Sequence, residues 1–228
     1  MSLEVSNIRP YQFELQERIC MEHCNSTTNI LTGIKALESL IGLGARVRAN
    51  TRVNKSTATM MKKQIESYIH HTEVDAGYAS KDFIPSVVVV TAPFTGRKIM
   101  TKAQGEATEE RAIAQLRKLA ARHRAALALP EPHHIDELGQ PELYRRAPPV
   151  VFSIICSGTK VFFASLDAAI TDDTVLPNVM TAFDFSQLGH DVWNGIAVAL
   201  LCINVRNATF EFIEELKDLE VKDKDSDA

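Results

Sequence analysis

The sequence lacks the features that mark a secreted or membrane protein. Its longest apolar run, residues 196–205, is shorter than the 18 or so residues needed to cross a bilayer. The opening stretch MSLEVSNIRPYQFELQER carries acids and has neither the basic start nor the apolar centre of a signal peptide. We therefore expect a protein of the cytoplasm or nucleus that does not associate with membranes.

Motifs for nucleophilic or phosphate chemistry are also missing. There is no Gly-x-Ser-x-Gly elbow and no glycine-rich phosphate loop. The segment Ser157-Gly158-Thr159-Lys160 matches Ser-x-x-Lys by letters, but it lies between two apolar segments and is better interpreted as a hairpin turn. The sequence therefore assigns no catalytic residue and no cofactor.

The chain has only four cysteines, and their placement does not suggest a disulfide framework. Cys156 and Cys202 lie in apolar segments, where a reduced thiol behaves as a small buried hydrophobe. Cys20 and Cys24 flank His23 on an expected helix. They provide too few ligands for zinc, because no matching pair lies elsewhere at zinc spacing. Thiols are favoured over a metal site here.

The histidines give two further candidate metal positions. His70-His71 precede Glu73 and Asp75, and His133-His134 precede two acids. Neither pair has the fixed helical spacing of His-Glu-x-x-His, so solvated histidines remain the favoured alternative to a metal. His123 lies on an apolar helix face and is expected to be a packing residue.

What is present is ordinary globular sequence: 228 residues, 45% hydrophobic and 24% charged. Residues 1–220 are expected to form one domain, with N-terminal helices in 10–71 and a sheet with a core helix in 84–205, followed by a charged tail at 221–228. Residues 45–55 are expected to be a loop or short edge strand. Apolar periodicity predicts helices over residues 10–25, 26–43, 56–71, 106–129, 187–205 and 208–219.

The strand pattern predicts a mixed α/β (α+β) fold with a small central sheet flanked by helices. Residues 87–90 are continuously apolar, as expected for a central strand covered on both faces. The 174–185 segment is either irregular or holds one short strand at 179–183. The other expected strands are 97–103 and the two arms of a hairpin at 150–156 and 160–166. The helix over 187–205 is apolar nearly all round and is expected to be buried.

Positive charge is concentrated in one part of the chain. Residues 97–124 hold eight Lys or Arg against three Glu, although the whole chain has a net charge of −4. Spacings of four, three and four place Arg111, Gln115, Lys118 and Arg122 on one helix face, and Arg97, Lys98 and Lys102 precede them. Such a face attracts phosphate or an acidic protein surface. The alternative is an ordinary solvated face, and the absence of interleaved aromatics argues against stacking on single strands.

The order of these elements resembles that of fungal nuclease-like proteins with a PD-(D/E)XK, restriction-endonuclease-like core. The resemblance is carried by VVVVTAP (87–93), AIAQLRKLAAR (112–122) and PVVFSIICSGTKVFFASL (149–166). It implies a metal site with an Asp and a Glu-x-Lys on neighbouring strands. The matching strand here has neither Glu nor Lys. The literal Glu220-Val221-Lys222 lies in the charged tail and is taken as a chance match.

The sequence therefore favours a non-catalytic binding protein on a degenerate nuclease-like core. Its contact surface would be the basic face (Arg97, Lys98, Lys102, Arg111, Gln115, Lys118 and Arg122), and its partner nucleic acid or an acidic protein. Two alternatives remain open. One is a divalent-metal nuclease that uses Asp82 with Glu73 or Asp75. The other is a homo-oligomeric assembly module that associates through a sheet edge or through the Leu31/Leu40 side of a helix.

Overall fold

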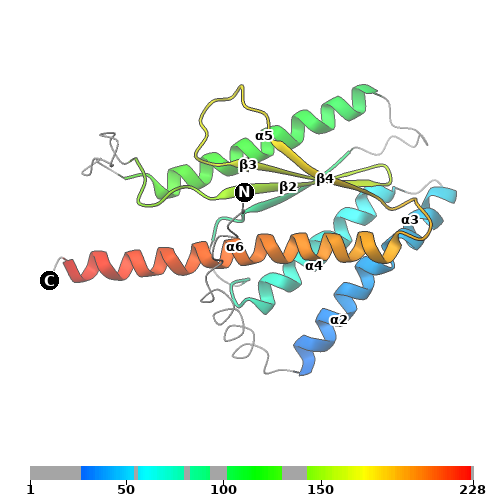
Figure 1. Ribbon diagram of the computed structural model, residues 1–228, viewed down its shortest axis with the longest axis horizontal. Helices are drawn as coiled ribbons and strands as arrows, with labels where there is room; N and C mark the ends of the chain where they lie inside the picture. The colour runs from blue at the N-terminus through cyan, green and yellow to red at the C-terminus, as the bar shows by residue number, and fades with distance from the viewer. Residues whose placement is uncertain (1–26, 54–55, 80–82, 93–101, 130–142, 227–228) are drawn as a thin grey trace, which may run out of the picture.

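Helices on both faces of one small sheet make up the fold (Figure 1). The computed structural model describes residues 27–53, 56–79, 83–92, 102–129 and 143–226. The elements are α2 (Thr27–Ile41), α3 (Leu43–Arg52), α4 (Thr57–Asp75), β1 (Val87–Thr91), α5 (Lys102–Leu127), β2 (Val150–Ser157), β3 (Lys160–Asp167), β4 (Asn178–Asp184) and α6 (Asp191–Ser226). The predicted mixed α/β fold is confirmed.

Among the described residues the sheet has four strands in the order β1-β2-β3-β4. β1 runs parallel to β2, with Val89 opposite Ile154, and α5 provides the crossover that a parallel pair requires. β2 and β3 form the predicted hairpin, whose turn contains Gly158 at φ 58°. The α5 crossover and the β2–β3 hairpin turn therefore explain why the sheet contains both parallel and antiparallel pairs.

The fourth strand differs from the expected one. β4 at Asn178–Asp184 pairs with β3, which settles the 179–183 segment as a strand. The predicted strand over 97–103 falls mostly outside the described residues, and its last two positions are already helical, because α5 begins at Lys102. The first expected helix, over 10–25, lies wholly outside the described residues.

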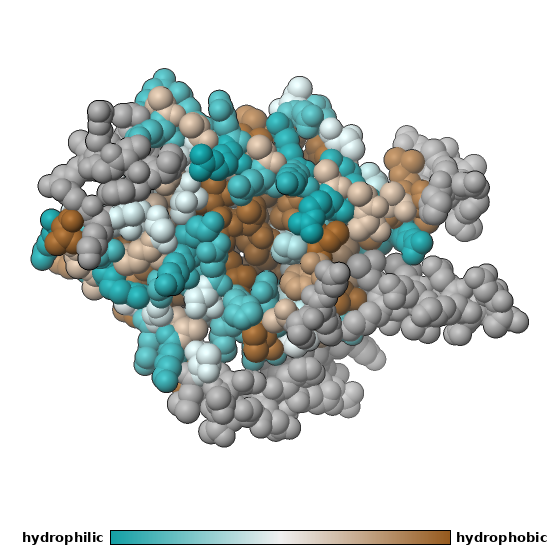
Figure 2. All heavy atoms as spheres, turned by 180° about the vertical axis from the view of Figure 1, so that it is seen from behind, coloured by the Kyte–Doolittle hydropathy of each residue, from teal (hydrophilic) through white to brown (hydrophobic). Residues whose placement is uncertain are grey.

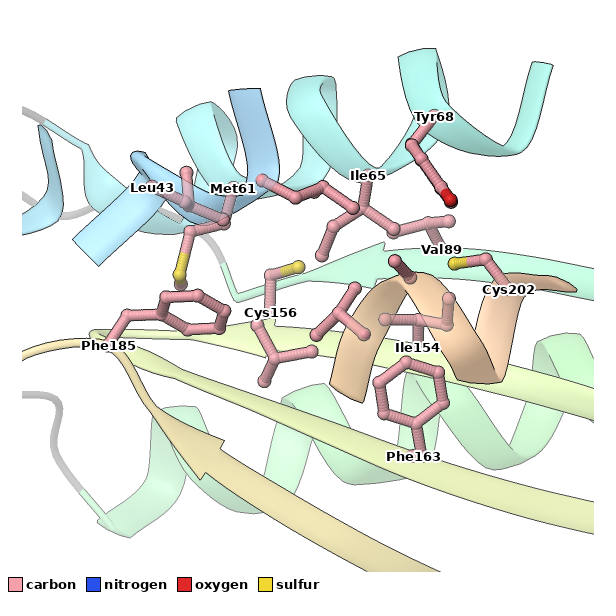
Figure 3. Packing of buried hydrophobic residues seen from close by; sticks show 14 of the residues in the cluster. Leu43, Met61, Ile65, Tyr68, Val89, Ile154, Cys156, Phe163, Phe185 and Cys202 are labelled. Atoms are coloured by element: carbon pink, nitrogen blue, oxygen red, sulfur yellow. The ribbon is translucent and has the colours of Figure 1, made fainter. Parts of the chain in front are cut away.

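Two apolar cores lie on opposite faces of the sheet. On one face α5 packs Leu116, Leu119 and Ala120 against strand residues that include Val151 and Leu166. On the other face, α4 and α6 pack Met61, Ile65, Val198 and Cys202 against Ile154, Cys156 and Phe163, as Figure 3 shows for several of them. α2 and α3 add Leu40, Leu43 and Val47 to this larger core. Since Leu40 is fully buried there, that position is not a free surface for assembly, contrary to the Leu31/Leu40 alternative.

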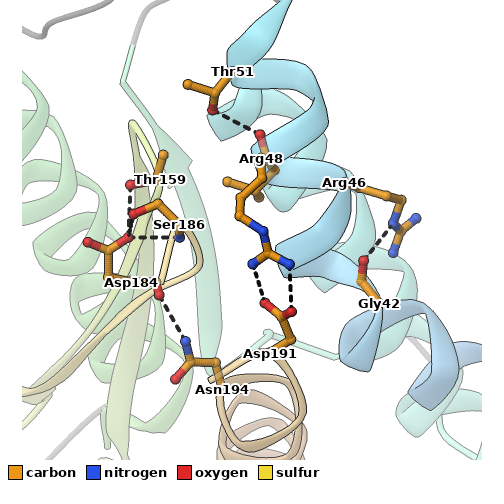
Figure 4. A network of polar contacts seen from close by, with 10 residues as sticks. Gly42, Arg46, Arg48, Thr51, Thr159, Asp184, Ser186, Asp191 and Asn194 are labelled. Atoms are coloured by element: carbon orange, nitrogen blue, oxygen red, sulfur yellow. Dashed lines mark hydrogen bonds and ion pairs between the residues drawn. The ribbon is translucent and has the colours of Figure 1, made fainter. Parts of the chain in front are cut away.

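Residues 45–52 are helical, so the expected loop or edge strand is wrong there. Leu43 and Val47 give α3 a buried side, although most of its other residues are polar. The Arg48 guanidinium binds both carboxylate oxygens of Asp191 at the start of α6, at 2.7 Å each (Figure 4). Tertiary contacts of this kind, which local sequence does not report, stabilise a short polar helix.

α6 also departs from expectation. It is one helix to Ser226, rather than two pieces followed by a tail. It is not buried all round: Trp193 is 71% exposed and Leu200 60%, because no described element covers that side. By length and composition alone, Asp191–Glu215 is the one described segment able to cross a membrane, but Val198, Ala199 and Cys202 pack in the core. A core helix of a soluble protein meets the same criterion, so this is weak evidence for a membrane span.

Candidate functional site

The basic stripe, defined as Arg111, Gln115, Lys118 and Arg122, lies on the solvent side of α5. All four side chains are exposed, as the spacing predicted. The opposite side of the helix is held against the sheet by Leu116, Ala120 and His123, which are at most 1% exposed. The apolar periodicity of α5 therefore fixes the direction in which the stripe points.

The cations of α5 divide into two groups. Arg117 and Arg124 serve the fold, since they donate to backbone carbonyls of the 168–175 segment, Arg124 Nη1 to Ala168 O at 2.7 Å. Lys102, which was expected to join the basic face, forms an ion pair with Glu106 at 3.6 Å. In contrast, Arg111, Lys118 and Arg122 have no ion pair with any acid of the described residues. Arg97 and Lys98 lie outside the described residues.

A hollow of about 400 Å³ borders the stripe, and we call it the edge groove. Its floor is β1, which is the edge strand of the described sheet rather than the expected central strand. Figure 2 shows this side of the molecule, with apolar atoms at the floor of a hollow and hydrophilic atoms along its rims. The groove is lined by Val87 to Thr91 of β1, by Lys62, Glu66, Ile69, His70 and Glu73 of α4, and by Arg111 and Gln115 of α5.

The backbone of β1 faces the edge groove at alternate residues. Ser86 O accepts from Phe152 N at 2.8 Å, and Ala92 N donates to Cys156 O at 3.0 Å. Even-numbered residues therefore pair with β2, and Val87, Val89 and Thr91 direct N–H and C=O to the opposite side. No described strand pairs with that side. At its end, Arg111 Nη1 lies 3.5 Å from Thr91 O.

The α4 wall of the groove carries Lys62 and His70 beside the acids Glu66 and Glu73. Lys62 pairs with Glu66 at 3.4 Å, and His70 Nδ1 lies 3.9 Å from Glu73 Oε2. Burial raises the pKa of Glu73, and the nearby His70 partly offsets that shift. Arg111 is the one cation of the lining that meets no acid among the described residues, so the α5 side of the groove is the side favourable for a carboxylate.

The described residues give the candidate metal positions, which the sequence did not favour, no support. No group of three or more His, Cys, Asp or Glu side chains comes together among them. Glu73 and Asp75 lie in the last turn of α4, not in the expected loop, and Asp75 pairs with Arg206 at 2.9 Å. Asp82, the Cys20/Cys24 pair and the second histidine pair lie outside the described residues.

The remaining candidates are structural. Cys156 and Cys202 are buried free thiols, as predicted, and burial raises the pKa of each to about 12. His123 is also buried, with Nε2 3.1 Å from Pro85 O and burial lowering its pKa. Lys160 opens β3 immediately after the hairpin turn at Gly158, so the Ser-x-x-Lys letters belong to that turn.

Sequence reasoning identified the stripe but missed the edge groove. The apolar run of β1 was visible, yet a run of valines does not tell an edge strand from a central one. The position of β1 depends on which segments pair with it, and that is a property of the whole sheet. No family model, curated protein or solved structure matches this chain.

Proposed function

We propose that this protein is a non-catalytic binding protein whose contact surface is the basic stripe of α5. The partner is nucleic acid or an acidic protein surface. The observation that carries the proposal is a contrast within one helix. Arg117 and Arg124 are half-buried and donate to the 168–175 segment. Arg111, Lys118 and Arg122 are exposed without an acidic partner among the described residues, although Arg111 also contacts Thr91 O at 3.5 Å. Exposed, unpaired cations in a line create a local field that attracts anions.

A degenerate nuclease-like core is part of this proposal. The parallel β1–α5–β2 crossover followed by the β2–β3 hairpin supports it, since this order of elements carries the resemblance. β1 supplies only valine and threonine where that family places its acid and lysine, which supports a binding rather than a cutting role. A cytoplasmic or nuclear location remains part of the same proposal.

Charge reversal tests the stripe directly. The triple variant Arg111→Glu, Lys118→Glu, Arg122→Glu is compared with Arg52→Glu, Lys63→Glu, Lys160→Glu, which changes three exposed cations elsewhere by the same net charge. Fluorescence anisotropy is measured with a duplex DNA, a single-stranded RNA and polyglutamate. The stripe variant is expected to lose binding to at least one probe, whereas the control variant keeps it.

The salt dependence gives a magnitude. If three cations each neutralise one phosphate of duplex DNA, log K falls with log salt at a slope of about −2.7, which is roughly 40-fold between 50 and 200 mM. Equal binding by the two triple variants would overturn the proposal. Binding of polyglutamate but not DNA identifies an acidic protein as the partner.

One observation favours a second candidate, the assembly module. The open edge of β1 is apolar and its backbone groups are unpaired within the described sheet, which is the usual route to edge-to-edge association. Sedimentation equilibrium over a range of protein concentrations tests this candidate. A monomer at all concentrations would remove it.

A further inference from the structure

We propose that the edge groove binds an extended acidic peptide segment, which adds to the sheet as a strand beside β1. This inference deepens the proposed function by naming its partner class, and it rests on that function for the role of Arg111. It does not require the rest of the stripe. Backbone pairing provides the affinity in such strand addition, and the groove walls select the side chains.

The backbone of β1 provides the first part of the argument. Val87, Val89 and Thr91 direct their N–H and C=O groups into the groove, because the residues between them pair with β2. From Val87 to Thr91 these three residues span two repeats of the strand, about 13 Å at roughly 3.3 Å per residue. Polar backbone groups at an apolar floor are stabilised by a strand that pairs with them.

The groove walls provide the second part. Val87 and Val89 pack toward the α4 side, and Val88 packs toward the α5 side. Alternate residues of an added strand would point to the same two sides. One set meets α4, where Glu66 and Glu73 disfavour acids and Ile69 offers an apolar contact. The other set meets Arg111 and Gln115 of α5. The matching ligand alternates apolar and acidic residues.

Charge also favours a separate peptide over a second copy of this chain as the occupant of the edge groove. α5 runs antiparallel to β1, because Arg111 lies at Thr91 and His123 lies at Pro85. A two-fold axis perpendicular to the sheet, which pairs two β1 edges antiparallel, would therefore bring the basic stripes of two copies together, Arg111 of one beside Lys118 of the other. Like charges at such a junction are destabilising. A separate acidic segment meets only opposite charge on the α5 side.

The probe is the acetylated and amidated peptide Val-Glu-Val-Glu-Val-Glu-Val, added to the full chain in fluorescence anisotropy or calorimetry. Two modified versions of this peptide carry N-methyl groups on the backbone. One is methylated at every Glu and the other at every Val. In an added strand only one of these sets donates to β1. We expect that set to lose about tenfold or more in affinity, because two or three hydrogen bonds are removed, and the other set to change little. N-methylation perturbs the ligand alone, so the protein stays folded in every arm.

Charge selectivity is tested with Val-Lys-Val-Lys-Val-Lys-Val and with Arg111→Glu. Each change is expected to weaken binding at least tenfold when made alone, and the lysine peptide is expected to regain affinity for Arg111→Glu. Lys63→Glu, on the exposed surface of α4 outside the groove lining, is the matched control and should leave binding unchanged.

The outcomes separate this inference from the proposed function. No peptide binding, or equal losses from both N-methylated sets, overturns strand addition. If DNA then still binds and depends on the stripe, the proposed function stands without the inference. If none of the peptide, DNA, RNA and polyglutamate binds, both are wrong. A concentration-dependent dimer that the peptide cannot dissociate shows that a second copy takes the edge, which also overturns the inference.

Discussion

Gly195 is the position where the packing of α6 on α2 makes the sharpest prediction. A Cβ at this residue would lie 2.7 Å from Ile41 Cα and 2.8 Å from both Ile41 N and the Leu40 carbonyl carbon. Carbon atoms in contact normally lie about 3.5–4.0 Å apart, so Gly195→Ala forces the two helices apart by about 1 Å. The obstacle is backbone, which has no rotamer to change.

Two effects of opposite sign set the magnitude. Overpacking of this kind costs about 1–3 kcal/mol in the free energy of unfolding. Replacing glycine by alanine within a helix returns about 1 kcal/mol. Because Leu40, Val198 and Ala199 of the larger core lie at this contact, we expect the upper part of the cost and a net loss of about 1–2 kcal/mol. For a chain of this length that lowers Tm by about 2–8 °C.

Thermal and urea unfolding followed by circular dichroism measure this change. Asn204→Ala, at an exposed position of the same helix, is the control, and its effect should stay within about 0.5 kcal/mol. Gly195→Ala should leave peptide and DNA binding unchanged, since the residue is remote from the stripe. A variant as stable as the wild type, or more stable, would refute the close approach of α6 to α2.

Three further predictions follow from particular contacts. Gly44→Ala places a methyl group against Asp191 Oδ1 and should break the ion pair between Asp191 and Arg48. Gly44→Ala and Asp191→Asn should each lower Tm, and the double variant should lose less than the sum of the two single losses. Burial lowers the pKa of His123 in the folded state, and its Nδ1 has no hydrogen-bond partner among the described residues. The stability that neutral His123 contributes is therefore complete above the unfolded pKa of about 6.5 and is lost as pH falls below it. Tm should fall more between pH 7 and pH 5 in the wild type than in His123→Gln. Trp193, the only tryptophan, is 71% exposed, so iodide should quench its fluorescence in the native state nearly as well as in urea; a protected tryptophan would mean that this side of α6 is covered.

The parts of the fold that follow from local signals were predictable. Ser56 caps α4 as its position suggests, since its hydroxyl accepts from Thr59 N at 3.3 Å. The β2–β3 hairpin follows from two β-rich arms around Gly158, and both cysteines in apolar segments are buried. The stripe is exposed because the apolar side of α5 sets the orientation of the helix.

The parts that depend on distant partners were not predictable. α3 reads as a polar loop, and its helix relies on the core around Leu43 and on the Arg48–Asp191 pair, 143 residues apart. The exposure of Trp193 depends on which elements cover α6, and apolar composition does not report that. In the same way, the valines of β1 indicate covered faces but not a position at the edge of the described sheet, so the groove emerges only from the strand order.

The claim that the open edge of β1 is a binding site is tested most directly by amide hydrogen exchange, measured residue by residue by NMR. The full chain is saturated with Val-Glu-Val-Glu-Val-Glu-Val, and exchange is compared with that of the free protein. Slower exchange is expected at two or more of Val87, Val89 and Thr91, with little change at Val88 and Val90, whose amides already pair with β2. Unchanged exchange at all three edge residues in the saturated complex would contradict the account.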